Sequence, residues 1–233
     1  MGIQMESKLI LLALFVIVML LMSYTVSKKT KTILFFGDSI TEFGTLPGGY
    51  LQLLNEKIVQ NGLSQLTCLG AGISGNKIYD LYLRLEDDVL NKNPALVVIL
   101  IGVNDVWHKV SHGTGTDANK FEKFYKAILN KLQASNIPVV LCTIISIGEK
   151  LQGQNRQDDD IDVYNGIIRN LSTTYQVPLC DLRKAAFDCI AAQNHTNADR
   201  GVLTKDGVHL NETGNRMVAE NIWQTIAQIP GFL

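Results

Sequence analysis

From Thr32 onward, short apolar runs alternate with longer segments in which apolar residues recur every three or four positions. The short runs have the length and composition of strands buried on both faces, and the longer segments have the period of amphipathic helices. Such alternation is typical of βαβ units, in which each helix returns the chain to the same edge of a parallel sheet. The sequence therefore predicts a three-layer α/β/α domain with a five-stranded, mostly parallel sheet. The expected strands are 33–36, 63–69, 95–101, 137–145 and 177–182.

Helical periodicity fills most of the remaining chain. The expected helices are 47–60, 77–91, 117–134, 158–175, a segment that ends near 192, and 212–229. The polar, glycine-containing stretch after Asp105 is instead predicted to be a loop of about ten residues, with His108 and His112 at the rim of a pocket or at the surface. The acidic run 158–160 is interpreted as a helix start, where carboxylates favour the positive end of the helix dipole.

An uninterrupted apolar stretch runs from Leu9 to Met22, and residues 23–26 extend it without a charge. About 18 helical residues span roughly 27 Å, which is close to the thickness of a bilayer's hydrocarbon core. Such a segment is either an uncleaved membrane anchor or a secretory signal, and the poor cleavage site at 25–27 favours the anchor. Residues 1–31 are therefore predicted to be an N-terminal hydrophobic anchor or signal segment with a basic flank, and residues 32–233 one domain.

The charges around this segment give two opposing indications of its orientation. Lys28, Lys29 and Lys31 follow the apolar stretch, which by the positive-inside rule places the domain in the cytoplasm. An N-terminal signal-like segment more often precedes an exported domain. We therefore expect a membrane-anchored or exported protein that contacts the membrane through residues 9–26 if these are not removed. An extracytoplasmic domain is favoured, with the orientation left open.

Composition and cysteine spacing exclude several classes of partner. The formal net charge is -1 and no Lys/Arg-rich stripe occurs, so no nucleic-acid partner is predicted. The four cysteines have no C-x-x-C or Cys/His metal spacing, and three lie in apolar strand-like runs. They are expected to be free, buried thiols. Neither a metal nor a cofactor is predicted.

Glycines and polar residues form four short blocks, three of them directly after predicted strands. The carboxyl ends of parallel strands lie side by side, so residues from distant blocks can share one pocket at that edge of the sheet. Each block also has an ordinary structural explanation as a turn or a helix cap, but the four together favour a functional site. The blocks are 37–41, 70–76, 102–105 and 206–211.

The residue types in these blocks suit acyl transfer, which needs a nucleophile, a base, a group that orients the base, and donors to an oxyanion. Ser39 has a hydroxyl, and the side chain of His209 changes protonation near neutral pH. Asp206, three residues before His209, can hold the imidazole in one tautomer. The candidate oxyanion donors are the backbone N–H groups of Ser39 and Gly72 and the amide of Asn104, with the bare backbone of Gly72 permitting close approach of a substrate.

Two neighbours of these residues are given other roles. Asp38 is next to Ser39, and adjacent side chains in a turn rarely point at the same imidazole, so Asp38 is expected to be a structural hydrogen-bonding residue. Trp107, after the third block, is a candidate for the pocket wall.

In sequence and in order, the four blocks resemble those of the SGNH (GDSL-type) hydrolases, an esterase and lipase family. The resemblance extends from the first strand to the last helix and implies a flavodoxin-like fold. It implies Ser39 as the nucleophile, His209 as the general base and Asp206 as the third triad member. It also implies an oxyanion hole formed by Ser39, Gly72 and Asn104. The Gly-x-Ser-x-Gly motif of α/β-hydrolases is absent.

The resemblance implies a serine esterase that hydrolyses carboxylic esters through an acyl-enzyme on Ser39. The expected partner is a small-molecule ester, either an acetylated sugar or a lysophospholipid-type lipid. Loops 106–116 and 146–157 contain no long apolar lid, which favours short acyl chains such as acetyl esters of carbohydrates. Two alternatives remain open: an acyltransferase with the same triad and a carbohydrate acceptor, and a non-catalytic flavodoxin-like binding module.

Overall fold

The computed structural model describes residues 14–15 and 30–233. The apolar stretch of the predicted anchor or signal segment lies, apart from two residues, outside these ranges, so this assignment remains a prediction. Within the described ranges, no helix combines the length and apolar character needed to cross a membrane. Lys31–Leu233 forms one compact unit.

A parallel sheet of five strands lies at the centre of this unit, in the order β2-β1-β3-β4-β5. Every neighbouring pair is parallel. All five residues of β3 are buried, as are the last five of β1, which explains why these strands are apolar without alternation. The strands are β1 (Lys31–Gly37), β2 (Leu66–Gly72), β3 (Leu96–Leu100), β4 (Val139–Cys142) and β5 (Leu179–Cys180).

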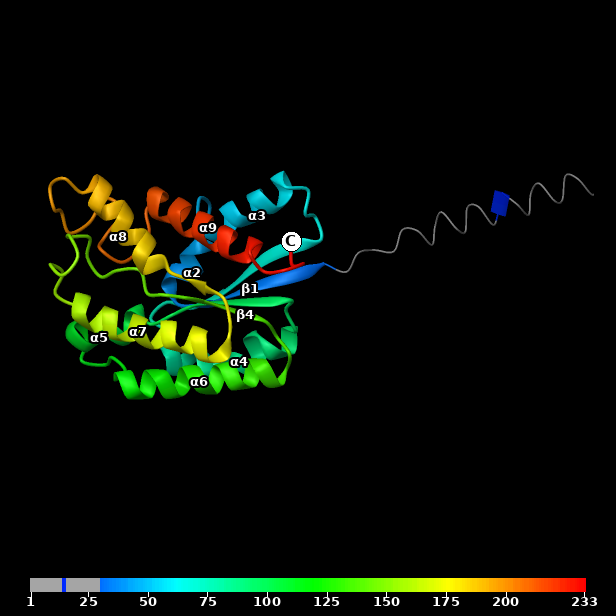
Figure 1. The fold of residues 1–233 in the computed structure, drawn as a ribbon, viewed down its shortest axis with the longest axis horizontal. Helices are drawn as coiled ribbons and strands as arrows, with labels where there is room; N and C mark the ends of the chain where they lie inside the picture. The colour runs from blue at the N-terminus through cyan, green and yellow to red at the C-terminus, as the bar shows by residue number, and fades with distance from the viewer. Residues whose placement is uncertain (1–13, 16–29) are drawn as a thin grey trace, which may run out of the picture. The chain divides into compact units, whose positions relative to one another are not determined.

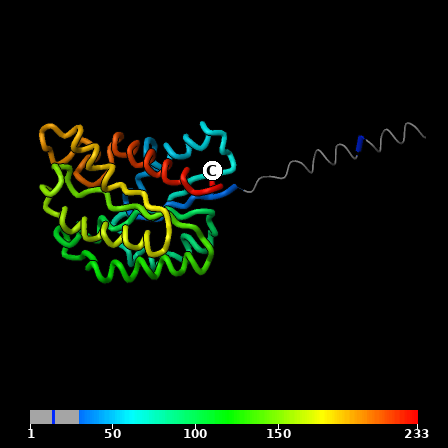
Figure 2. The backbone as a smooth tube through the Cα atoms, in the orientation of Figure 1, coloured from blue at the N-terminus to red at the C-terminus, as the bar shows by residue number. Residues whose placement is uncertain are grey.

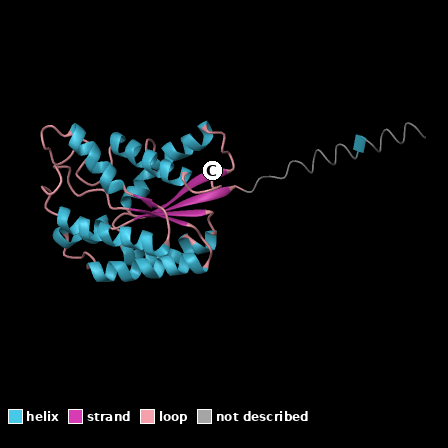
Figure 3. Ribbon diagram, viewed as in Figure 1, coloured by secondary structure: helices cyan, strands magenta, loops and turns pink. Residues whose placement is uncertain are grey.

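Helices cover both faces of the sheet, which confirms the predicted three-layer α/β/α fold (Figures 1 and 3). On one face lie α4 (Ile78–Asp88), α5 (Val103–Ser111), α6 (Ala118–Ala134) and α7 (Asp158–Tyr175). On the other lie α2 (Ser39–Gly44), α3 (Tyr50–Gln60), α8 (Leu182–Gln193) and α9 (Glu212–Ala227). A short 3-10 helix, η1 (Leu90–Lys92), follows α4.

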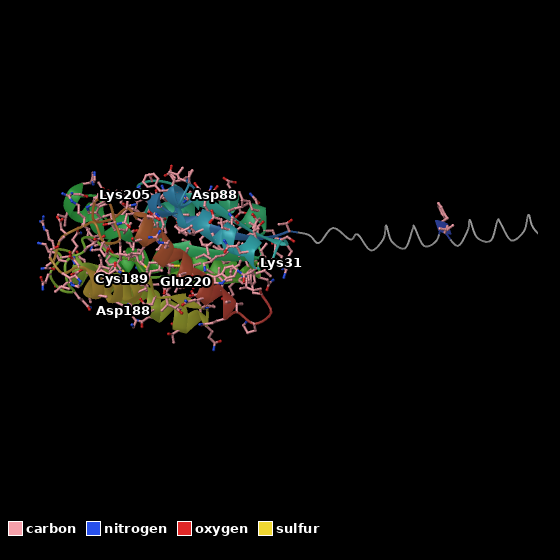
Figure 4. The ribbon with its side chains drawn as sticks, turned by 90° about the horizontal axis from the view of Figure 1, so that it is seen from above. Lys31, Asp88, Asp188, Cys189, Lys205 and Glu220 are labelled. Atoms are coloured by element: carbon pink, nitrogen blue, oxygen red, sulfur yellow. The ribbon has the colours of Figure 1, made fainter. Side chains whose placement is uncertain are left out.

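The last helix packs beside one of the first, as the path of the chain shows (Figure 2). Lys57 of α3 forms an ion pair with Glu220 of α9 at 2.7 Å, and Glu220 is labelled in Figure 4. The backbone N–H of Tyr50 donates to Asn215 Oδ1 at 2.9 Å. These contacts join α9 to both ends of α3.

The stretch after β3 is a helix, and the prediction of a loop there was wrong. Helix α5 begins directly after Gly102, whose φ of +122° turns the chain out of the strand. Val103 and Val106 are buried in the core, and this burial outweighs the polar, histidine-containing composition that suggested a loop. As a result, His108 and His112 lie one turn apart, with ring centroids 4.5 Å apart.

The cysteines agree with the expectation from the sequence. All four are free; Cys68, Cys142 and Cys180 are buried, and Cys189 on α8 is partly exposed (Figure 4).

Close packing at the ends of β1 and β2 requires two glycines. Gly37 and Gly72 are paired in the parallel register. A Cβ atom on Gly72 would lie 2.2 Å from the backbone nitrogen of Glu42, and one on Gly37 would lie 2.4 Å from the carbonyl oxygen of Leu100. At these positions β2 approaches α2, and β1 approaches β3, too closely for any side chain.

Gly72→Ala is expected to lower the free energy of unfolding by about 1–3 kcal/mol, because the added methyl group strikes the backbone of α2. Urea denaturation measures this loss. The control is Gly166→Ala within α7, where a Cβ has nothing within 4 Å and is expected to stabilise the protein by about 0.4–1 kcal/mol. Equal midpoints for Gly72→Ala and the wild type would contradict the close approach.

Candidate active site

Ser39 lies where β1 turns into α2, at the carboxyl edge of the sheet. Asp38 caps this helix, and its Oδ1 accepts a hydrogen bond from the backbone N–H of Ile40 at 3.0 Å. Ser39 itself is 5% exposed. The turn thus places Ser39 at the edge of the sheet with little of its surface exposed.

His209, 170 positions further along the chain, contacts this hydroxyl. The distance from Ser39 Oγ to His209 Nε2 is 3.0 Å, and His209 Nδ1 lies 2.7 Å from Asp206 Oδ2. The nitrogen that faces a carboxylate carries the proton, which leaves Nε2 free to accept the proton of Ser39. The three side chains therefore form a continuous hydrogen-bonded chain from carboxylate to hydroxyl.

Asp206 is held in place by its own turn. Its Oδ1 accepts hydrogen bonds from the backbone N–H groups of Val208 at 3.0 Å and His209 at 2.8 Å. Partial burial acts to raise the pKa of Asp206, but the hydrogen bonds from the side chain and backbone of His209 outweigh it and hold that pKa below its usual value. Asp206 is thus ionised at neutral pH and able to fix the imidazole.

The other residues that the sequence singled out lie on the neighbouring strand ends. Ser39, Gly72 and Asn104 follow or end β1, β2 and β3, which are adjacent in the sheet. Asn104 is 2% exposed, and its Nδ2 donates to the carbonyl oxygen of Asn76 at 3.1 Å. One of its two amide hydrogens is engaged in this way, and the contact fixes the plane of the amide.

The reason for a glycine at position 72 differs from the one expected. We had expected the missing side chain to make room for a ligand, whereas the space is occupied by the backbone of α2. The close packing of β2 against α2 therefore explains why residue 72 has no side chain, and it leaves the role of the Gly72 N–H group as a separate question.

Asp38 makes the structural hydrogen bond that the sequence suggested, but it is also a buried acid. It is 1% exposed, and its Oδ2 has no hydrogen-bond partner among the described residues. Burial raises the pKa of Asp38 to about 7, and burial likewise raises that of Asp105 to about 6. Repulsion from the carboxylate of Asp105 adds to the rise in the pKa of Asp38, so Asp38 is still partly protonated near neutral pH.

Two aromatic rings flank His209. The ring centroid of Phe43 is 5.3 Å from that of His209, and the centroid of Trp107 is 6.3 Å from it. Trp107 and Asp206 line a hollow of about 240 Å³. Phe43, Asp206 and His209 line another of about 700 Å³. The Asp206–His209 turn therefore borders two hollows, one lined by Trp107 and the other by Phe43.

Arg84 on α4 supports the site from below, and the motifs did not indicate it. Its NH2 group donates to the carbonyl oxygens of Gly37 at 2.7 Å and Ala71 at 3.0 Å, and its Nε to Asn76 Oδ1 at 2.8 Å. The guanidinium lies 4.5 Å from the ring centroid of Phe36. It thus ties together the ends of β1 and β2. The sequence does contain a signal for Arg84. It lies three residues after the buried Leu81, so it borders the buried face of α4.

Comparisons with known proteins agree on one family. The model of the GDSL-like lipase/acylhydrolase family matches residues 35–217. The crystal structure of the acetyl xylan esterase AlAXEase is 55% identical, with a TM-score of 0.82, covering 84% of this chain and 99% of that one. The acetylxylan esterase of Geobacillus stearothermophilus is 29% identical over 81% of this chain and 90% of its own. The uncharacterized lipoprotein YqeF of Bacillus subtilis (strain 168) is 25% identical over 89% and 96%.

Asp38 generates a prediction about pH. Its folded-state pKa, about 7, exceeds the ordinary value of 3.8, so its stabilising contribution is complete below about pH 4 and is lost as the pH rises through 7. Asp38→Asn keeps the acceptor for Ile40 but does not titrate. The stability of the wild type relative to this variant should fall by up to roughly 4 kcal/mol between pH 4 and pH 8. Urea denaturation across that range measures it, and a difference that does not change with pH would contradict it.

Proposed function

Because the chain belongs to the GDSL-like lipase/acylhydrolase family and is a carboxylic ester hydrolase, we propose that it removes acetyl groups from carbohydrates with Ser39, His209 and Asp206 as its catalytic residues. The observation that carries this assignment is the hydrogen-bonded chain from Asp206 through His209 to Ser39, with contacts of 2.7 and 3.0 Å. The comparisons do not favour an acyltransferase or a non-catalytic binding module.

The first half of the reaction forms an acyl-enzyme. His209 Nε2 takes the proton of Ser39 as Oγ attacks the acetyl carbonyl, and a bond forms between Oγ and the carbonyl carbon. Asp206 stabilises the imidazolium that results. The tetrahedral intermediate then collapses: the bond to the sugar oxygen breaks, and His209 donates its proton to that oxygen.

Water completes the reaction by the same route. His209 accepts a proton from the water as its oxygen attacks the acetyl carbon, and collapse of the second intermediate breaks the bond to Ser39 Oγ. The proton passes from His209 to Ser39, and the product leaves as acetic acid, which then ionises to acetate in solution. Each proton removed is thus returned, and the site regains its starting state.

The negative charge of both intermediates needs preorganised donors. We assign this role to the backbone N–H groups of Ser39 and Gly72 and to the side-chain amide of Asn104, which come from three adjacent strand ends. The contact of Asn104 with Asn76 supports the assignment, because it holds the second amide hydrogen of Asn104 in a defined direction.

The sugar has to lie on the side of His209, since this residue protonates the leaving oxygen. The hollow of about 700 Å³ beside His209 is the candidate position. Phe43, Leu46 and Pro47 line it with apolar surface, and its polar lining includes Asn211 and Asn215. A sugar ring has apolar faces and a hydroxyl-bearing edge, so this mixed lining suits a carbohydrate leaving group. The names of the two esterases described above support the same substrate class.

We also propose that the catalytic domain lies outside the cytoplasm, attached through residues 9–26. The relationship to a lipoprotein supports anchoring or export. The uninterrupted apolar stretch from Leu9 to Met22 supports attachment through this segment. Protease treatment of intact cells should therefore remove the domain, whereas its survival would contradict this placement.

Ser39→Ala is expected to lower kcat for p-nitrophenyl acetate by at least about 10⁴-fold, because it removes the nucleophile. His209→Ala should do the same, while the matched variant His108→Ala should retain kcat within about threefold, since His108 lies on α5 outside the hydrogen-bonded chain. Circular dichroism and urea midpoints establish that all three are folded. Full turnover by folded Ser39→Ala would contradict the assignment.

Phe43→Ala is expected to lower the ratio of kcat/KM for an acetylated xylooligosaccharide to kcat/KM for p-nitrophenyl acetate by about tenfold, because only the oligosaccharide extends over this wall. The matched control is Leu83→Ala, an apolar residue 76% exposed on α4, which should leave the ratio within twofold. If Phe43→Ala lowers both values equally, the hollow is not where the sugar binds.

A further inference from the structure

A buried carboxylate in the loop after β4 binds the segment that leads to the catalytic turn. Glu149 is fully buried, and its side chain accepts hydrogen bonds from the backbone N–H groups of Val202 at 2.6 Å, Leu203 at 2.9 Å and Thr204. It also accepts one from the hydroxyl of Thr204 at 2.6 Å. Lys205, the next residue, is labelled in Figure 4. One side chain thus orders a segment more than fifty positions away.

The charge of Glu149 is met by the backbone. Three successive N–H groups form a concave site for an anion, and hydrogen bonds to an ionised acceptor are stronger than those between neutral groups. Among the described residues Glu149 has no ion pair, so these donors carry the cost of burying it. A glutamine at position 149 would replace one acceptor oxygen by an NH2 group, so that a donor would face the backbone donors.

The ordered segment continues directly into the Asp206–His209 turn. Thr204 Oγ1, which donates to Glu149, accepts the backbone N–H of Gly207 at 3.0 Å. The carbonyl oxygen of Gly207 accepts the backbone N–H of Gly148 at 2.8 Å. The residue at the centre of the turn is therefore held on both sides, by Glu149 through Thr204 and by the residue just before Glu149.

We propose that Glu149 is a positioning residue for catalysis: acting through Thr204 and Gly207, it sets the place of the Asp206–His209 turn relative to Ser39. The inference rests on the proposed catalytic roles of these three residues. It goes beyond them by identifying what holds the base at 3.0 Å from the nucleophile. A displacement of the base of about 1 Å is enough to cost on the order of 10² in rate.

A double-mutant cycle tests this role with p-nitrophenyl acetate. Glu149→Gln is expected to lower kcat by about 10–100-fold with KM within threefold, because ground-state binding is not altered. Asp206→Ala removes the carboxylate whose placement is at issue. In that background Glu149→Gln should lower kcat by less than threefold more, whereas a general structural defect would multiply the two effects. The residual rate of the Ser39→Ala variant is subtracted from each measured rate.

Thr204→Val gives a second route to the same result. It removes the hydroxyl that joins Glu149 to Gly207 and keeps the backbone hydrogen bonds of Glu149, so it should show the same loss of kcat and the same lack of additivity with Asp206→Ala. Thr204→Ser, which retains the hydroxyl, should restore kcat to within threefold of wild type. If Glu149→Gln does not fold, the Thr204 pair decides the question.

Asp158→Asn is the matched control. Asp158 is also a buried carboxylate that accepts backbone N–H groups of the loop after β4, from Gly153 and Asn155, but it pairs with Arg183 rather than with the 202–207 segment. Asp158→Asn should lower the urea midpoint and keep kcat within threefold.

The proposal is overturned if folded Glu149→Gln or Thr204→Val keeps wild-type kcat, or if the loss of kcat in either variant multiplies with the loss caused by Asp206→Ala. Full activity of Asp206→Ala alone would instead overturn the catalytic assignment on which the proposal rests.

Discussion

Parallel pairing of β1 with β2 on one side and β3 on the other is the constraint on which the active site depends. The register places Gly37 opposite Gly72 and opposite Leu100, so the three strands end at one level. Ser39 follows the first strand, Gly72 ends the second and Asn104 follows the third. Because neighbouring strands are about 4.8 Å apart, these residues lie at adjacent strand ends without any long loop to bring them together.

Three buried acids beneath and beside this edge are accommodated in different ways. Burial raises the pKa of Asp38 to about 7 and that of Asp105 to about 6, and Oδ2 of Asp38 has no hydrogen-bond partner among the described residues. Glu149 is surrounded by donors: three backbone N–H groups and a hydroxyl. The contrast lies in the number of hydrogen-bond donors that the surrounding backbone offers to each buried carboxyl group. Asp38 and Glu149 each accept backbone hydrogen bonds beside a turn that carries a proposed catalytic residue.

Local patterns were sufficient for most of the fold and for the components of the site. Apolar runs such as 95–101 identified the strands because both faces of the central sheet are covered by helices. The pattern failed after Asp105, where composition indicated a loop and burial of Val103 and Val106 produced α5. It also gave an incomplete reason for Gly72, because the approach of α2 is a property of packing between elements. Arg84 and Glu149 were missed because neither lies in a turn-like or strand-end motif.

The sequence by itself determined the fold class, the order of the four blocks and the residue types needed for acyl transfer, because periodicity and turn chemistry are local properties of the chain. Only the tertiary structure decided which of these side chains contact one another, and at what distance. Ser39 and His209 are 170 positions apart, and Glu149 and Thr204 are 55 apart, so no local pattern reports their contacts. These pairs meet because the crossover helices return every strand to the same edge of the sheet. Placement of the base therefore depends on loops whose sequences, read separately, show no catalytic role.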